Sequence, residues 1–154
     1  MNAYENLKKA GLALPATPAP GGNYTPAKRC GDLLYLSGQG PRLPDGRWCT
    51  GKVGGDVSVE EAYGHARMVG LQLLGVAHDA VGDLNRIEVV KVLGMVNATP
   101  DFGEHPAVIN GCSDLFIEIL GEAGKHARSA VGFGSLPNRM TVEIEVILRV
   151  LPPD

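Results

Sequence analysis

Residues 140–151 read MTVEIEVILRVL, and the alternation of side chains in this stretch decides the fold. Every even-numbered position is apolar: Met140, Val142, Ile144, Val146, Leu148 and Val150. Successive side chains of a strand point to opposite faces, so this set predicts a strand whose even face packs beneath helices. The odd face carries Glu143 and Glu145 together with aliphatic side chains. That face is neither plain core nor plain solvated surface.

The residues before this strand predict its hairpin partner. Residues 127–136 read as a second strand, and Pro137-Asn138 as the turn between the two. We assume a register in which Ser135 pairs with Met140. Arg128 then lies on the same face as Glu143 and Glu145, together with three small residues (Ala130, Gly132 and Gly134). Val131 and Phe133 lie on the core face. The small residues leave room on this face for a ligand, a neighbouring subunit or both. The alternative, a solvated face with incidental charge pairs, explains the pattern equally well.

Two helices and two further strands are expected upstream. An apolar stripe from Val59 to Ala80 predicts a helix, which Ser58 and Glu61 open as a capping box. A second stripe predicts a helix that begins near Pro106 and ends at Gly121 or Gly124. The strands are residues 33–36 and 87–96. This order predicts an α+β fold with two helices on one face of a mixed sheet.

The composition excludes several classes of protein. The 154 residues are 44% hydrophobic and 20% charged, a balance typical of a globular chain, so residues 1–154 are expected to form a single domain. The formal net charge is -3 and no basic run is present, so no nucleic-acid partner is expected. No apolar stretch approaches the ~20 residues of a membrane span, so no membrane association is expected either.

Cysteines and histidines give two further expectations. The three cysteines cannot all pair and form no CxxC motif, which favours a reduced, cytoplasmic setting (Cys30, Cys49 and Cys112). The four histidines show no metal-ligand spacing, so no metal site is expected (His65, His78, His105 and His126).

Two separated strings match a known family. The string Ala127-Arg128-Ser129-Ala130-Val131, followed by Leu136-Pro137 and Val142-Glu143-Ile144-Glu145, resembles the C-terminal signature of the RidA (YjgF-like) family of enamine/imine deaminases. The earlier string Leu36-Ser37-Gly38-Gln39 resembles the N-terminal signature of that family. The two signatures occur together and in order, which makes the match specific.

The resemblance implies a fold, an assembly and an activity. The fold is the chorismate-mutase-like (bacillus-type) α+β fold, assembled as a barrel-like homotrimer with ligand clefts between subunits. The implied activity is hydrolysis of reactive enamine or imine acids, such as 2-aminoacrylate or 2-iminopropionate, to 2-keto acids and ammonia without a cofactor. The family also includes ribonucleases, an activity that the net charge of -3 disfavours here. Another alternative is a non-catalytic or regulatory trimer, which would bind a carboxylate metabolite through Arg128.

The resemblance also implies roles for individual residues. Arg128 would capture the substrate carboxylate through its planar fork of donors, and Glu143 would polarise the attacking water. Tyr24, where the family carries a tyrosine near its ligand, would orient that water or close the pocket. Backbone groups near Ala130 and Gly38 would position the substrate, and Asn110 falls near the helix asparagine of the family. For Arg128 the alternative is a structural salt bridge to Glu143 or Glu145 across the hairpin, and the same alternative applies to Glu143.

This sequence departs from the family pattern in two ways. Ala130 stands where the signature often has cysteine, and the chain has extra residues in the N-terminal strip and around residues 40–53. The extra length indicates a longer branch of the family. Arg42, Arg47 and Trp48 in the insertion either line a cleft or decorate a loop, and the loop interpretation is favoured because most loop residues carry no function.

Overall fold

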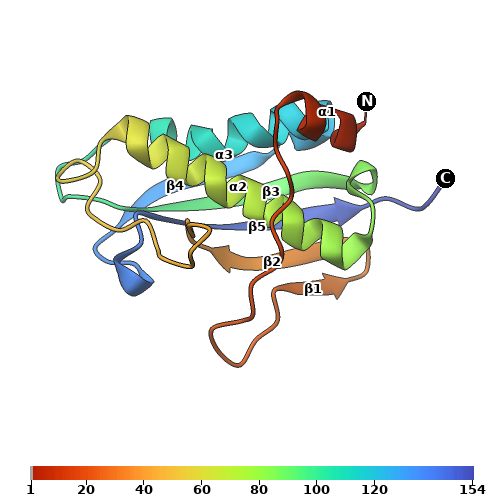
Figure 1. Ribbon diagram of the computed structural model, residues 1–154, viewed down its shortest axis with the longest axis horizontal. Coiled ribbons are helices and arrows are strands. Elements are labelled where there is room, and N and C mark those ends of the chain that lie inside the picture. The colour runs from red at the N-terminus through yellow and green to blue at the C-terminus, as the bar shows by residue number, and fades with distance from the viewer. Residues whose placement is uncertain (1) are drawn as a thin grey trace.

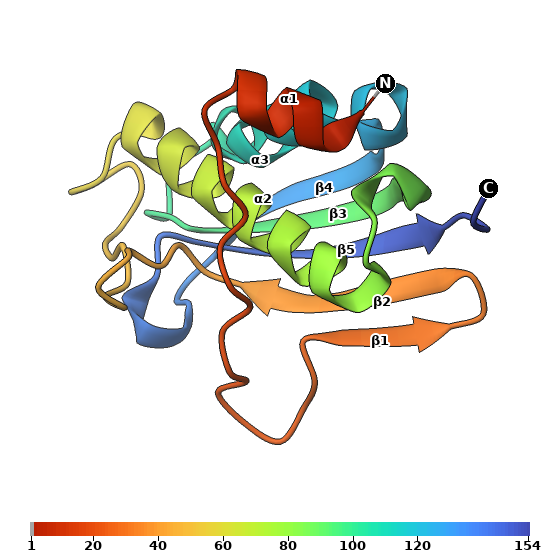
Figure 2. The ribbon, with the colours of Figure 1, turned by 45° about the vertical axis from the view of Figure 1, so that its right-hand side comes forward.

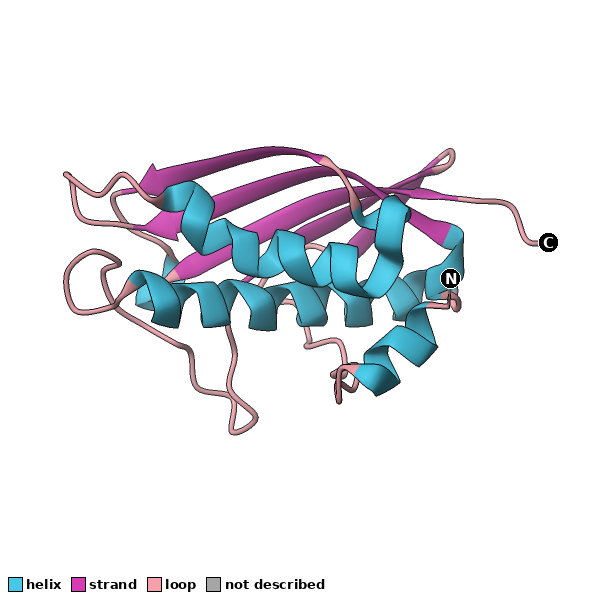
Figure 3. Ribbon diagram, turned by 90° about the horizontal axis from the view of Figure 1, so that it is seen from above, coloured by secondary structure: helices cyan, strands magenta, loops and turns pink. Residues whose placement is uncertain are grey.

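The computed structural model describes residues 2–154, which form a five-stranded sheet with helices on one face (Figures 1 and 3). The strands, in sheet order, are β1 (Ala27–Cys30), β2 (Leu33–Gln39), β5 (Val142–Val150), β3 (Ile87–Asn97) and β4 (Ala127–Phe133). Among the strands of residues 2–154, only β3 and β4 run parallel. The helices are α1 (Ala3–Lys9), α2 (Val59–Val81) and α3 (His105–Leu120), with short 3-10 turns at Leu84–Arg86, Gly121–Gly124 and Pro137–Arg139. The α+β prediction is confirmed.

The core lies between the sheet and the long helices α2 and α3. The even-numbered side chains of β5 from Val142 to Val150 are 0–3% exposed and belong to this core, as the alternation predicts. The two helices pack closely because a Cβ at Gly111 of α3 would lie only 2.0 Å from the carbonyl oxygen of Tyr63 in α2. One face of the sheet is therefore fully covered, and the other face bears no helix (Figure 3).

The ends of the long helices follow the local signals. The Ser58 hydroxyl accepts a hydrogen bond from the Glu61 backbone N–H at 3.1 Å, and Gly82 closes α2 in the left-handed region at φ 83°. Pro106 lies in the first turn of α3, and Gly121 follows its last residue. Caps therefore mark both ends of α2, whereas α3 begins at His105 without a side-chain cap.

The predicted hairpin is wrong. β4 and β5 flank β3 on opposite sides, and the turn at Pro137–Arg139 carries the chain across the end of β3. Arg128 pairs with Val92, which is fully buried beneath the helices, so the side chains of Arg128 and Ala130 point to the helix layer. The face assignment in β4 is the reverse of the expected one. The alternation of side chains along a strand shows which residues share a face. The strand with which it pairs decides whether that face is the buried or the exposed one.

The N-terminal segment adds a helix that the sequence pattern did not indicate. In α1, Ala3 and Leu7 are buried, and the Asn6 side-chain amide donates to the Ile119 carbonyl oxygen of α3 at 3.0 Å. The proline-rich strip then runs from α1 across α2 to β1 (Figure 2). The crossing is close, since a Cβ at Gly75 would lie 2.6 Å from the Pro15 carbonyl oxygen. Within residues 2–154, the helices are all too short or too polar to cross a membrane.

Candidate active site

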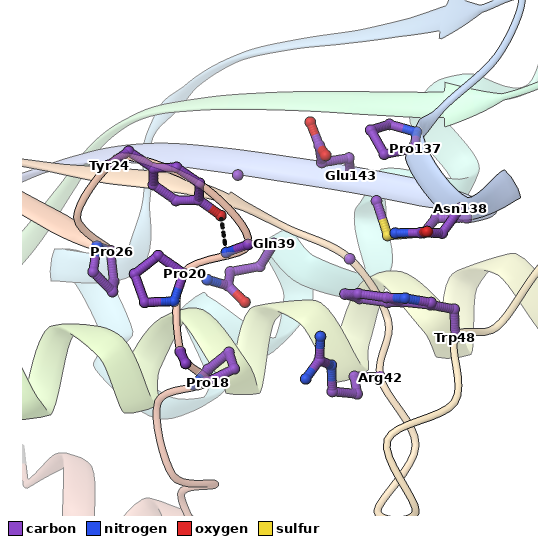
Figure 4. A pocket seen from close by; sticks show the side chains of 15 residues that line it. Pro18, Pro20, Tyr24, Pro26, Gln39, Arg42, Trp48, Pro137, Asn138 and Glu143 are labelled. Atoms are coloured by element: carbon purple, nitrogen blue, oxygen red, sulfur yellow. Dashed lines mark hydrogen bonds between the residues drawn. The ribbon is translucent and has the colours of Figure 1, made fainter.

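A cleft of about 270 Å³ opens where β2 ends and β5 begins (Figure 4). Its walls come from four segments: the N-terminal strip, the end of β2, the loop after β2 and the turn before β5. The residues that line it are Pro18–Gly21, Tyr24, Pro26, Gly38–Gly40, Arg42, Trp48, Pro137, Asn138, Met140 and Glu143. Three of the predicted site residues, Tyr24, Gly38 and Glu143, therefore lie together.

Glu143 is the acid of this cleft. It projects from the second position of β5 on the face without helices, where its main chain pairs with Met95 of β3. The side chain is half-buried against Gly38, at which an added Cβ would lie 3.0 Å from Glu143 Oε2. Burial raises the pKa of the Glu143 carboxyl above its usual range, and the nearby Glu145 carboxylate raises it further. A carboxyl with a raised pKa is suited to general acid–base work near neutral pH.

Tyr24 forms the outer rim of the cleft. Its hydroxyl accepts a hydrogen bond from the Gly21 backbone N–H at 3.2 Å, which folds the end of the strip into a tight loop (Figure 4). The side chain remains 54% exposed. Tyr24 is therefore placed to cover a ligand that enters toward Glu143.

The insertion after β2 contributes directly to the cleft, so the loop interpretation is wrong for two of its three large residues. Arg42 and Trp48 form an antiparallel bridge on either side of the Asp45-Gly46 turn, and both line the cleft. Only Arg47, paired with Asp45 at the exposed tip, decorates the loop. The Asp-Gly pair is a hairpin signal, and it would have indicated that Arg42 and Trp48 face each other.

Arg128 lies at a second location, against α3. Its Nη1 donates to Asn110 Oδ1 at 2.8 Å and to Ser113 Oγ at 3.1 Å. Ala130 follows on the same face of β4 and packs partly buried against the core. The predicted residues Arg128, Asn110 and Ala130 are therefore brought together. Asn110 holds the arginine, and the remaining guanidinium N–H groups stay available for a ligand.

Two residues that the motifs did not indicate complete this second cluster. The His126 Nδ1 faces the Gly124 carbonyl oxygen at 2.6 Å, so Nδ1 donates and Nε2 accepts from the Ser113 hydroxyl at 2.8 Å. Burial lowers the pKa of His126, and the Arg128 charge lowers it further. The neutral imidazole thus orients Ser113, whose oxygen receives the Arg128 N–H. Ser113 lies one helical turn from Asn110, a spacing that puts both on the same side of α3.

The two clusters lie on opposite faces of the sheet. Glu143 points to the face without helices and Arg128 to the helix layer, and no salt bridge joins them within residues 2–154. The alternative of a salt bridge from Arg128 to Glu143 or Glu145 across a hairpin is therefore wrong. One subunit does not present both groups to a single small molecule.

Comparison with known proteins identifies the family of the chain. The family model described as "YjgF/chorismate mutase-like, putative endoribonuclease" matches residues 5–144, which include the N-terminal string, the C-terminal string as far as Ile144 and both clusters. The chain belongs to this family. Protein TCP17 of Trypanosoma cruzi is 40% identical over 147 residues, a match that covers 94% of this chain and 92% of that protein.

Solved structures place the chain within the YjgF-like family. A "putative endoribonuclease" from Shewanella oneidensis is 32% identical and superposes with a TM-score of 0.93, covering 97% of this chain and 100% of the other. RidA from an Antarctic Psychrobacter is 30% identical with a TM-score of 0.60, covering 87% of this chain and 94% of the other. The chain therefore has the YjgF-like fold, and its shape agrees more closely with the Shewanella protein than with this RidA.

Proposed function

We propose that the protein hydrolyses small reactive enamine and imine acids to 2-keto acids and ammonia. A water oxygen bonds to the imine carbon while the C=N π pair moves to nitrogen, which takes a proton. Glu143 accepts the proton that the water loses. Glu143 then returns its proton to the nitrogen of the resulting carbinolamine. As the hydroxyl oxygen of the carbinolamine loses its proton to water and forms the C=O bond, the C–N bond breaks and ammonia leaves. An enamine such as 2-aminoacrylate first takes a proton at its methylene carbon and loses one from its nitrogen, which gives 2-iminopropionate.

The observation that carries this proposal is the Glu143 carboxyl in the cleft. It is half-buried, its pKa is raised, and it faces space for a small molecule beside Gly38 and Tyr24. A base whose pKa is closer to the working pH transfers protons in both directions more effectively. An imine carbon is already electrophilic, so orientation and activation of water are sufficient chemistry.

The carboxylate anchor in this proposal is Arg128 of a neighbouring subunit. Within one chain Arg128 and Glu143 point to opposite faces of the sheet, so a shared substrate requires two chains. The face without helices supports an assembly, because it exposes Tyr35, Val131 and Phe133 by 40–44% each. β4 is an edge strand, which brings Arg128 to the border of the subunit. A homotrimer with sites between subunits, as the family resemblance implies, satisfies these requirements.

The names of the relatives raise the alternative of RNA cleavage. Among the residues that line the cleft, Arg42 is the single basic side chain, and the net charge is -3. A surface that follows a phosphate backbone needs several basic groups. The residues of the cleft therefore favour a small acid over RNA.

The test is ammonia and 2-keto acid release from freshly generated 2-iminopropionate. Wild type is expected to accelerate release over the spontaneous rate, and Glu143→Gln to lose about 10²- to 10⁴-fold in kcat. Glu60→Gln is the matched control, since Glu60 is exposed in the first turn of α2, outside the cleft. Equal rates with and without folded wild type would contradict the proposal. Cleavage of single-stranded RNA by wild type, lost in Glu143→Gln, would favour the alternative.

A further inference from the structure

The cleft contains one positive side chain, which lies at the opposite end from Glu143. Figure 4 shows Glu143 at the top of the cleft and Arg42 at the bottom, with Trp48 along one side and Pro18 and Pro20 along the other. The Arg42 guanidinium carbon lies 4.3 Å from the centroid of the Trp48 ring, a stacking distance. The two charged groups therefore mark the ends of a space whose sides carry no charge.

The position of Arg42 is fixed from both sides. Its backbone N–H donates to Gln72 Oε1 at 3.1 Å, and the Gln72 amide donates to the Gly40 carbonyl oxygen at 2.7 Å. Gln72 belongs to α2 and is only 8% exposed. On the other side, the bridge to Trp48 closes the hairpin. Ordering this arginine costs little upon ligand binding because the protein already holds its backbone and stacks its side chain.

Arg42 has no anionic partner within the described chain. Arg47, Arg67 and Arg149 each lie within salt-bridge distance of a carboxylate, and Arg128 donates to two oxygen atoms of α3. No carboxylate of residues 2–154 lies within 4.0 Å of Arg42. A stacked guanidinium with free donors is the preferred group for bidentate capture of a carboxylate.

We infer that Arg42 binds a second carboxylate at the far end of the substrate, so that the preferred substrates are dicarboxylic imino acids. This inference rests on the proposed function. The imine carbon would lie at Glu143, the carboxylate beside it would meet Arg128 of the neighbouring subunit, and the distal carboxylate would meet Arg42. The aliphatic chain between them would lie against Trp48, Pro18 and Pro20, which match it in polarity.

The test compares two imines of equal carbon number. An amino-acid oxidase with catalase generates one from L-glutamate and the other from L-norvaline, which carries a methyl group in place of the distal carboxylate. Wild type is expected to prefer the glutamate-derived imine by about tenfold or more in kcat/KM, the effect of a charge-assisted hydrogen bond. Arg42→Gln is expected to reduce that ratio to about one, and Arg47→Gln is the matched control. Arg47 lies in the same hairpin but outside the cleft, so its loss should leave the ratio unchanged.

The outcomes separate the inference from the function on which it rests. A wild-type ratio near one, or a ratio that survives in Arg42→Gln, overturns the role of Arg42 while turnover of 2-iminopropionate still supports the deaminase. Absence of turnover with every imine overturns the proposed function and the inference with it. Arg42→Lys provides a second variant in case Arg42→Gln does not fold. It keeps the charge but loses the planar fork, so we expect it to retain part of the preference, and full retention of the wild-type ratio would exclude bidentate binding.

Discussion

Replacement of Gly38 by alanine should reduce turnover without unfolding the protein. The new Cβ would lie 3.0 Å from Oε2, 3.1 Å from Cδ and 3.2 Å from Cγ of Glu143. Non-bonded atoms prefer a separation of about 3.5–4.0 Å, so the carboxylate must move by roughly 0.5 Å. A misplacement of about 1 Å costs about 10²-fold in rate, and half that shift should therefore lower kcat by roughly tenfold.

The same substitution should have little effect on stability. The displaced atoms are the end of a flexible side chain, and Gly38 has no positive φ that alanine would resist. Alanine also restricts the unfolded chain, which stabilises by about 0.4–1 kcal/mol. Urea unfolding should thus give a free energy within about 1 kcal/mol of wild type, while ammonia release from 2-iminopropionate falls. Unchanged turnover in a folded Gly38→Ala protein would refute the placement of Glu143 at the reacting atoms.

Three further predictions follow from other positions. Glu145→Gln removes a negative charge that raises the pKa of Glu143, so the acidic limb of the pH–rate profile should move to lower pH; an unmoved limb would contradict the coupling. Gly111→Ala should lower the free energy of urea unfolding by about 3 kcal/mol or more, because its Cβ would overlap a backbone carbonyl oxygen of α2. Gly64→Ala, whose Cβ meets open space in the same helix pair, should raise that free energy by up to about 1 kcal/mol. The pKa of His126 is lowered in the folded state, so the unfolded chain binds the proton more readily; stability should fall as pH drops below the ordinary histidine value near 6.5, and His126→Gln should weaken that slope.

Local chemistry in the sequence predicted the layered part of the fold. The alternation in residues 140–151 identifies the buried face of β5, and Ser58 with Gly82 marks the ends of α2. These signals succeed because each depends on contacts within a few residues or on a single buried face. The resemblance placed Glu143, Gly38 and Arg128 in one site, and the structure divides these residues between two clusters.

Long-range pairing lay beyond the same reasoning. Pro137-Asn138 resembles a hairpin turn, yet β3 lies between the two strands that it connects. No local signal distinguishes a tight turn from a crossing over one strand, and this error reversed the face of Arg128. The place of Arg42 in the cleft depends on Gln72, thirty residues away in α2. Such contacts appear only once the elements are assembled.

The most direct test of the account is activity in a mixture of two inactive variants. If one substrate meets Arg128 of one subunit and Glu143 of another, Arg128→Ala and Glu143→Gln should each be inactive alone. When the two proteins are unfolded and refolded together in equal amounts, random assembly into trimers leaves about a quarter of the sites with both native groups. Ammonia release from 2-iminopropionate should therefore return to about a quarter of the wild-type rate. A mixture that stays inactive, although it forms mixed trimers, would contradict a site shared between subunits.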